Sequence, residues 1–98
     1  MLESKIENKL KIEVKKRGGM ALKFVSPGLA GVPDRIVLMP KGKVAFVELK
    51  APGKKMRVLQ LKRKKQLETL GFKVYLIDSF KAVNDFIQEM VGNGKDKI

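Results

Sequence analysis

The stretch that decides the fold is PDRIVLMPKGKVAFVELK, residues 33–50. It has apolar runs on either side of Pro40-Lys41-Gly42, and proline and glycine between two apolar runs are typical of a β-hairpin turn. In an antiparallel hairpin, a turn centred on Lys41 pairs residue 34 with residue 48. The pattern therefore predicts that Asp34 lies directly opposite Glu48, with their Cβ atoms about 5 Å apart.

Two carboxylates and one ammonium group are expected on the same face of this hairpin. Lys50 follows Glu48 by two residues, so it projects from the same side of the strand. Two like charges this close repel each other unless a cation neutralises them. A divalent metal ion would do so, and so would a nearby arginine such as Arg35. Ligation by oxygen alone favours Mg²⁺ or Mn²⁺ over softer metals.

Hydrolysis of a phosphodiester is the chemistry that such a site supports. A metal ion polarises a phosphoryl oxygen and lowers the pKa of a bound water, and Lys50 is placed to orient that water or to stabilise charge on the phosphate. The competing interpretation is structural, because an aspartate after a proline is common in turns and Glu48 can form a solvated salt pair with Lys50. The apolar neighbours of these residues favour the hydrolytic site.

The overall charge favours a polyanionic partner. The chain has 98 residues, with 22 lysines and arginines against 10 acidic residues and a net charge of +12. It contains no cysteine and no histidine, which excludes disulfides, thiol nucleophiles, Cys/His zinc sites and a histidine general base. No signal peptide is evident, and no apolar run approaches the ~20 residues of a membrane span. We therefore expect a cytoplasmic protein with no membrane partner and no organic cofactor.

The segments around the hairpin predict a single α/β domain. Ile6, Leu10 and Val14 recur every four residues, which indicates a helix over 2–17. The remaining predicted elements are a first strand over 20–25, a basic helix over 56–70, a fourth strand over 72–77 and an amphipathic helix after Ser79. The order is αβββαβα, a mixed four-stranded sheet flanked by helices, with the domain over 1–92 and a flexible tail over 93–98.

A run of basic residues follows the hairpin. It begins at Lys54 and continues to Lys65 without an intervening acid, and such residues bind phosphates without selecting a sequence. Since the run starts four residues after Lys50, we expect part of it to lie beside the site. The candidate DNA-binding residues are Lys54, Lys55, Arg57 and Lys64, whereas the leucines of the same segment, Leu59, Leu67 and Leu70, are expected in the core.

The loop before Asp34 provides two further candidates for DNA contacts. It contains Ser26-Pro27-Gly28, and glycine lets backbone amides approach a phosphate closely. A plain tight connection would need the same residues. Ser26 and Gly28 are therefore named as candidates on a weak pattern.

Two longer stretches resemble a known family of nucleases. Gly31-Val32-Pro33-Asp34-Arg35-Ile36-Val37 and Phe46-Val47-Glu48-Leu49-Lys50-Ala51-Pro52-Gly53 closely resemble the PD-(D/E)XK superfamily, and more narrowly the VRR-NUC family of virus-type replication-repair nucleases. Lys23–Gly28, Leu59-Gln60 and Leu70–Val74 also match the pattern, so the resemblance covers about residues 1–80. It implies a restriction-endonuclease-like core of order αβββαβ, which agrees with the order predicted above.

The resemblance also implies roles for residues of the hairpin. In such a site Asp34 and Glu48 are metal ligands, Leu49 offers its backbone carbonyl to the metal ion, and Lys50 is the catalytic lysine. We further expect Glu48 to lie outside the core, so that replacing it would leave the fold intact.

Three residues outside the hairpin are assigned by the same resemblance. Many members of the superfamily add a glutamate from the first helix to the metal site; Glu3 is the best match, and Glu7 is the reserve candidate one turn along. Gln60 matches a family glutamine that could steady the attacking water or the scissile phosphate. A solvated helix residue is the alternative for each.

The function implied is a Mg²⁺- or Mn²⁺-dependent DNA endonuclease. Family members are often selective for branched DNA, so branched DNA or four-way junctions in phage or bacterial replication, recombination or repair are the expected substrates. Small stand-alone members form homodimers, and a homodimer is expected here. The alternative is a non-catalytic basic nucleic-acid-binding domain in which Asp34, Glu48 and Lys50 form only salt bridges.

Overall fold

A computed structural model describes residues 1–92 of the chain. Its elements follow the predicted order: α1 (Glu3–Lys16), β1 (Met20–Lys23), β2 (Arg35–Met39), β3 (Lys43–Leu49), α2 (Val58–Thr69), β4 (Lys73–Ile77) and α3 (Phe80–Val91), with a short 3₁₀ turn at Pro40–Gly42. The extent of the domain stays a prediction, and the tail expected over 93–98 lies outside the described residues.

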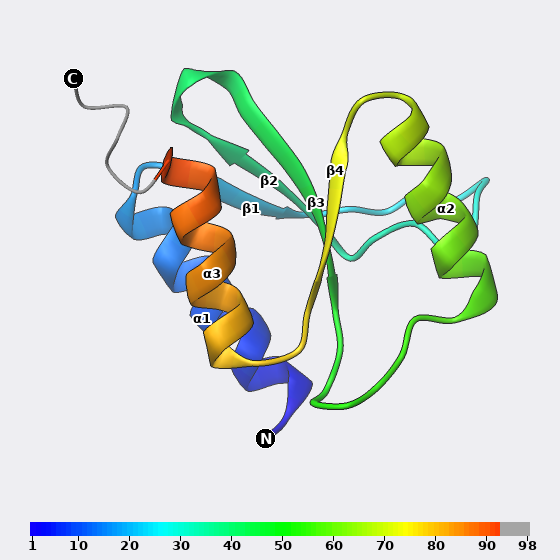
Figure 1. The fold of residues 1–98 in the computed structure, drawn as a ribbon, viewed down its shortest axis with the longest axis horizontal. Coiled ribbons are helices and arrows are strands. Elements are labelled where there is room, and N and C mark those ends of the chain that lie inside the picture. The colour runs from blue at the N-terminus through cyan, green and yellow to red at the C-terminus, as the bar shows by residue number, and fades with distance from the viewer. Residues whose placement is uncertain (93–98) are drawn as a thin grey trace.

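The four strands form one mixed sheet in the order β1-β2-β3-β4. Neighbouring strands are antiparallel from β1 to β3, whereas β3 and β4 are parallel and are joined by the crossover through α2 (Figure 1). In the central hairpin, Arg35 pairs with Val47 and Met39 with Lys43. This is the register predicted from the turn, and the α/β fold class with a mixed four-stranded sheet is confirmed.

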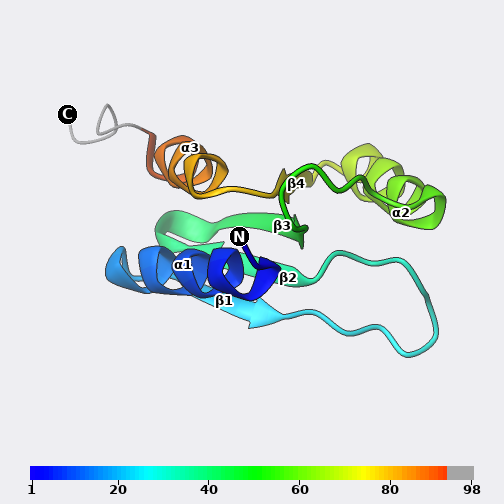
Figure 2. The same ribbon diagram turned by 90° about the horizontal axis from the view of Figure 1, so that it is seen from below.

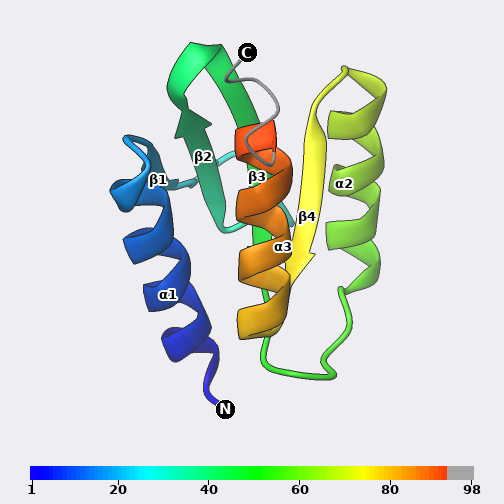
Figure 3. The same cartoon turned by 60° about the vertical axis from the view of Figure 1, so that its left-hand side comes forward.

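One face of the sheet packs against α1 and α3, which lie side by side (Figure 3). The predicted stripe of Ile6, Leu10 and Val14 on α1 is completely buried. It meets Val47 and Phe86 in the main core. Burying an aliphatic or aromatic side chain stabilises a fold by about 1.5–3 kcal/mol, so this layer holds β2 and β3 in place.

The opposite face of the sheet is only partly covered. There α2 lies beside β4 (Figure 2), and the rings of Phe24, Phe46 and Phe72 follow one another with centroids 5.4 and 5.6 Å apart. None of the α2 side chains is buried. The prediction that Leu59 and Leu70 belong to the core is wrong, since both are exposed, Leu70 by 73%. The helical spacing of these leucines does not reveal their exposure, because polar contacts, and not an apolar stripe, hold α2 against the domain.

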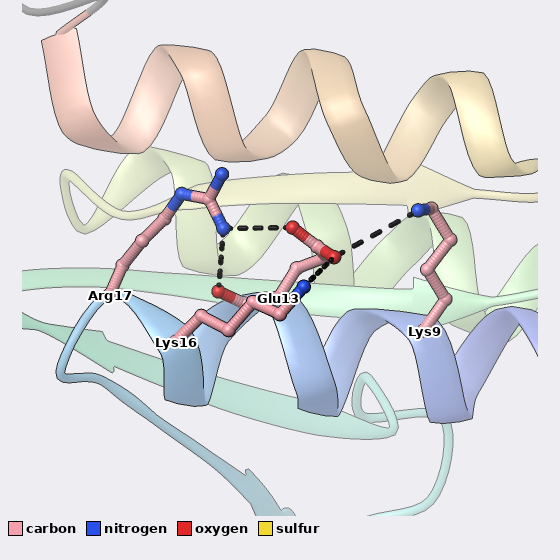
Figure 4. Close-up of polar contacts among 4 residues, drawn as sticks. All are labelled: Lys9, Glu13, Lys16 and Arg17. Atoms are coloured by element: carbon pink, nitrogen blue, oxygen red, sulfur yellow. Dashed lines mark hydrogen bonds and ion pairs between the residues drawn. The ribbon is translucent and has the colours of Figure 1, made fainter.

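A cluster of charges fixes the C-terminal half of α1 (Figure 4). The carboxylate of Glu13 accepts a hydrogen bond from Arg17 at 2.8 Å and pairs with Lys16 and Lys9 at 3.5 and 4.0 Å. The hydrogen bond from Arg17 is the main reason why the pKa of Glu13 lies below its ordinary value of 4.5. This cluster therefore stabilises the fold above pH 4.5, and the contribution is lost as the pH falls through the lowered pKa.

Within residues 1–92, no helix has both the length and the apolar character needed to cross a bilayer.

Candidate active site

The predicted carboxylates meet where β2 begins and β3 ends. Because Arg35 pairs with Val47, extending the register by one residue sets Asp34 across from Glu48. Side chains alternate along a strand, so Asp34 and Glu48 share the face of the sheet opposite α1 and α3. Burial raises the pKa of Glu48, and the negative charge of Asp34 raises it further. The structure therefore brings the two acids together as the sequence predicts.

Backbone hydrogen bonds hold Asp34 in place. Its Oδ2 accepts a hydrogen bond from the Leu49 backbone N–H at 2.9 Å, and its carbonyl accepts one from the Phe24 N–H at 2.8 Å. The first bond crosses from β2 to β3, and the second ties the end of β1 to the same residue. Asp34 is thus fixed by both neighbouring strands through one carboxylate oxygen and its carbonyl.

Glu48 is buried, with only 1% of the residue exposed. Its Oε2 accepts a hydrogen bond from Gln60 Nε2 at 2.7 Å and lies 3.4 Å from Lys50 Nζ. Its Oε1 is also buried, and among residues 1–92 it has no hydrogen-bond partner. Glu48 is thus not part of the main apolar core, in line with the expectation, but it is fully buried and lies against Gln60 of α2. A buried oxygen without a partner is costly, and such groups occur where a ligand satisfies them.

Burial raises the pKa of Glu48, the charge of Asp34 raises it further, and Lys50 opposes both effects. The folded chain therefore binds a proton at this carboxyl more readily than the unfolded chain. Without metal, the free energy of unfolding should fall as the pH rises from the ordinary value of 4.5 through the raised pKa. Urea denaturation in EDTA at a series of pH values should show this decrease in the free energy of unfolding for the wild type and a smaller decrease for Glu48→Gln. The same pH dependence in both proteins would contradict the raised pKa of Glu48.

The residues present fit a hard divalent cation. The orphaned Oε1 of Glu48 and the second oxygen of Asp34 are oxygen donors on one face, which suits Mg²⁺ or Mn²⁺. No group of three or more acidic side chains that could hold a metal ion is assembled within the described part of the chain. Two carboxylates with water and substrate oxygens are a usual set for Mg²⁺, and the carbonyl of Leu49 stays a predicted further ligand.

The glutamates of α1 differ in their surroundings. Glu3 is exposed, yet it is near enough to contribute to the raised pKa of Glu48. Glu7 is paired with Arg35, whose Nε and Nη2 lie 3.0 and 2.9 Å from Glu7 Oε2, and Arg35 Nη1 also donates to the Ala21 carbonyl at 3.0 Å. Arg35 thus links α1, β1 and β2, and it pairs with Glu7 instead of neutralising the site carboxylates.

Gln60 lies at the first turn of α2, with both ends of its amide engaged. The Nε2 group donates to Glu48, as above, and Oε1 accepts a hydrogen bond from the Arg57 backbone N–H at 2.8 Å. In this arrangement the amide positions Glu48 and caps α2. Each end keeps room for one further hydrogen bond, through the second N–H and the second lone pair of the amide, so the predicted contact with water or phosphate stays a prediction.

The candidate DNA-binding residues come from α2, from the loop that precedes it and from the loop between β1 and β2. Lys54 and Lys55 are exposed in the loop between β3 and α2, Arg57 is exposed at the start of α2, and Lys64 pairs with Glu68 at 3.1 Å. The loop between β1 and β2, which contains Ser26 and Gly28, extends toward α2 (Figure 2).

Comparison with solved structures identifies the fold. The chain is similar to a structure described as "VRR_NUC domain", with a TM-score of 0.83 and 30% sequence identity over 88% of this chain and 94% of that chain. This chain belongs to the VRR-NUC family. It is also 53% identical over 77 residues to the protein named "Putative nuclease p44" of Acyrthosiphon pisum secondary endosymbiont phage 1, which is 79% of this chain and 83% of that protein. No family model matches the chain. The predicted VRR-NUC resemblance is thereby confirmed.

Two contacts in this VRR-NUC domain were not predicted. Arg63 Nε donates to the Ala30 carbonyl at 2.7 Å, and Arg35 bridges to Glu7 across 28 residues of sequence. Arg63 is one of several neighbouring cations, so its charge alone did not distinguish it. Gly31 is a partial indication of the contact between the β1–β2 loop and α2. It has a φ of +85° and lies close against Leu59, and a glycine there permits the loop to approach α2.

Proposed function

We propose that this chain is a metal-dependent DNA endonuclease that hydrolyses phosphodiester bonds. The observation that supports it most directly is the buried Oε1 of Glu48, which has no hydrogen-bond partner within residues 1–92 and lies on the face shared with Asp34. Lys50 contacts the other oxygen of the same carboxylate. Membership of the VRR-NUC family and similarity to a protein named as a nuclease support the same function. Because the chain has no histidine, its hydrolytic chemistry depends on carboxylates, lysine and a metal ion.

Each residue of the site would have a separate role in hydrolysis. Asp34 and Glu48 would hold Mg²⁺ or Mn²⁺, which when bound polarises a phosphoryl oxygen and lowers the pKa of a water. The Nζ of Lys50, 3.4 Å from Glu48 Oε2, would orient the nucleophilic water and stabilise charge on the phosphate. Water adds across the P–O bond, leaving a 5′-phosphate and a 3′-hydroxyl as expected for this superfamily.

Branched DNA is the proposed substrate, with nicking of duplex DNA as the second choice. The chain would act in the cytoplasm of a bacterial or phage-infected cell, during replication, recombination or repair. Shape and backbone would be recognised, since the exposed cations beside the site contact phosphates without selecting bases.

The test is a cleavage panel of hairpin, flap, fork and four-way DNA in Mg²⁺ and in Mn²⁺. Cleavage that stops in EDTA supports the proposal, and faster cleavage of branched substrates supports the substrate class. DNA binding without cleavage in either metal would instead favour the alternative, a non-catalytic basic domain.

Lys54→Glu combined with Lys55→Glu should weaken DNA binding and reduce its dependence on salt. If both lysines contact phosphates, the slope of log K against log salt should fall by about 0.9 for each contact that is lost. Fluorescence anisotropy in Ca²⁺ over a range of salt concentrations measures the slope. Lys81→Glu with Lys11→Glu reverses the same charge on other helices and serves as the control. An unchanged slope would place the DNA elsewhere.

The proposed partner besides DNA is a second copy of the chain. The partly covered face of the sheet has an apolar area along its β1 side, the β1 patch, formed by Met20, Leu22, Leu38 and Val44. Met20 is 57% and Leu22 39% exposed, and all four project from one face. The patch has no charge in a chain of net charge +12, so it suits an apolar partner and not DNA. A two-fold dimer would bring two sites to one substrate.

Leu22→Glu should convert this dimer to a monomer. Burying an unpaired carboxylate in an apolar contact costs several kcal/mol, so the mass from light scattering should fall from twice 11.0 kDa to 11.0 kDa. Ile12→Glu, at an exposed apolar residue of α1, is the control and should leave the dimer intact. A dimer that survives Leu22→Glu rules out the β1 patch as the interface.

A further inference from the structure

The helix α2 is attached to the domain unlike the other two helices. None of its side chains is buried, and Val58 at its start is 86% exposed. By contrast, α1 and α3 each bury a stripe of apolar residues. Helices in proteins draw most of their stability from packing of an apolar face, so α2 depends on a small number of specific contacts.

Those contacts lead to the candidate active site and to the loop beside it. Gln60 donates to Glu48 at 2.7 Å, Arg63 donates to Ala30 in the β1–β2 loop at 2.7 Å, and Leu59 packs against Gly31 of that loop. The loop in turn ends at Asp34. Of these contacts, only the bond from Gln60 reaches a carboxylate proposed to bind metal.

The two oxygens of Glu48 have separate environments. Oε2 is taken by Gln60 and Lys50, whereas Oε1 is buried without a partner in the described part of the chain. A cation at Oε1 would leave the Gln60 bond in place. It would also hold the carboxylate in one orientation, which keeps Oε2 facing the Gln60 amide.

We propose that Gln60 is a positioning residue that couples occupancy of the metal site to the placement of α2. This rests on the proposed function, because it assumes that Glu48 binds metal. When a cation occupies the site, the Glu48–Gln60 bond is fixed, and with it the Arg57 cap and the first turns of α2. Coupling is reciprocal, so anything that orders α2, including DNA along its basic residues, also tightens metal binding.

Hydrogen exchange of the uncleaved, DNA-free protein tests the coupling. Amide exchange rates are compared in EDTA and in Mg²⁺. The Mg²⁺ concentration is chosen by calorimetry so that it saturates each variant. In the wild type, exchange of α2 amides should slow several-fold with Mg²⁺. In Gln60→Met, which keeps the length of the side chain but has neither donor nor acceptor, α2 exchange should be the same with and without Mg²⁺, and Mg²⁺ affinity should fall about 5-fold or more.

Two control variants distinguish the effect of the Gln60–Glu48 hydrogen bond from that of the Arg57–Gln60 helix cap. Arg57→Pro removes the backbone N–H that donates a hydrogen bond to Gln60 Oε1. The φ of Arg57, −73°, suits proline. This variant leaves the bond to Glu48, so it should retain the response of α2 to Mg²⁺. Gln88→Met makes the same change on the exposed side of α3 and should behave as the wild type.

The outcomes distinguish this proposal from the proposed function. If Mg²⁺ protects the end of β3 but not α2 in the wild type, or if Gln60→Met keeps the α2 response, the coupling is wrong and the nuclease proposal stands. If Mg²⁺ protects no part of the chain and supports no cleavage, both are wrong.

Discussion

Glu48→Gln should abolish metal-dependent DNA cleavage while the domain stays folded. The amide keeps the volume of a side chain that is 1% exposed, so it opens no cavity, but it removes the negative charge and places a neutral group where Oε1 now lies. Loss of a single electrostatic contact at a reacting centre lowers kcat by about 10²–10³-fold, and loss of the metal ion adds to this. Initial rates on supercoiled plasmid and on four-way DNA in Mg²⁺ measure the effect.

Thermal unfolding provides the readout that does not depend on activity. At a Mn²⁺ concentration about one hundred times the dissociation constant, binding stabilises the folded state by about 2.7 kcal/mol. That raises the Tm of a domain of this size by roughly 10–20 °C. The increase should be absent in Glu48→Gln and present in Glu89→Gln, which changes an exposed glutamate of α3. Cleavage by Glu48→Gln within about tenfold of the wild type would show that Glu48 is not a ligand.

Lys50→Met should lower kcat by about 10²–10³-fold with little change in metal binding. The Nζ of Lys50 lies 3.4 Å from Glu48 Oε2 and its side chain is 13% exposed, so we expect the ammonium to lie beside the scissile phosphate when DNA is bound. Methionine fills the space of the alkyl chain without the charge. Removing a cation beside the metal site should leave the Mn²⁺ dissociation constant equal or lower, which is the opposite of the effect of Glu48→Gln.

The split between rate and metal affinity is what identifies the role of Lys50. Single-turnover rates at saturating DNA give the chemical step, and calorimetry gives the affinity for Mn²⁺. Lys73→Met, at an exposed lysine paired with Glu89, is the matched control. If Lys50→Met loses metal affinity in proportion to rate, the lysine only maintains the fold of the site.

Local patterns were enough to predict the central hairpin. The turn residues fixed which residues of β2 and β3 are paired, and that register set Asp34 opposite Glu48. The periodicity of α1 likewise identified Ile6, Leu10 and Val14 as core. These features depend on residues close in sequence, where period and turn chemistry are strong signals.

The surroundings of the site could not be predicted in the same way. Glu48 is hydrogen-bonded to Gln60, 12 residues later and on another element, and the pairing of Arg35 with Glu7 spans 28 residues. The leucines of α2 have a helical spacing that is compatible with a core, but charge surrounds them and the helix is fixed by polar contacts. Such contacts between distant elements have no periodic signature in the sequence.

The lack of buried side chains on α2 has an evolutionary consequence. Exposed helix positions tolerate most substitutions within about 0.5 kcal/mol, so this segment can accumulate changes that would unfold α1 or α3. Related chains could thus acquire new preferences among DNA shapes by altering the outer side chains of α2, while the strand that holds Glu48 stays the same. Gln60, Arg63 and the glycine that admits Leu59 would be the constrained positions in this otherwise freely varying helix and its adjoining loop.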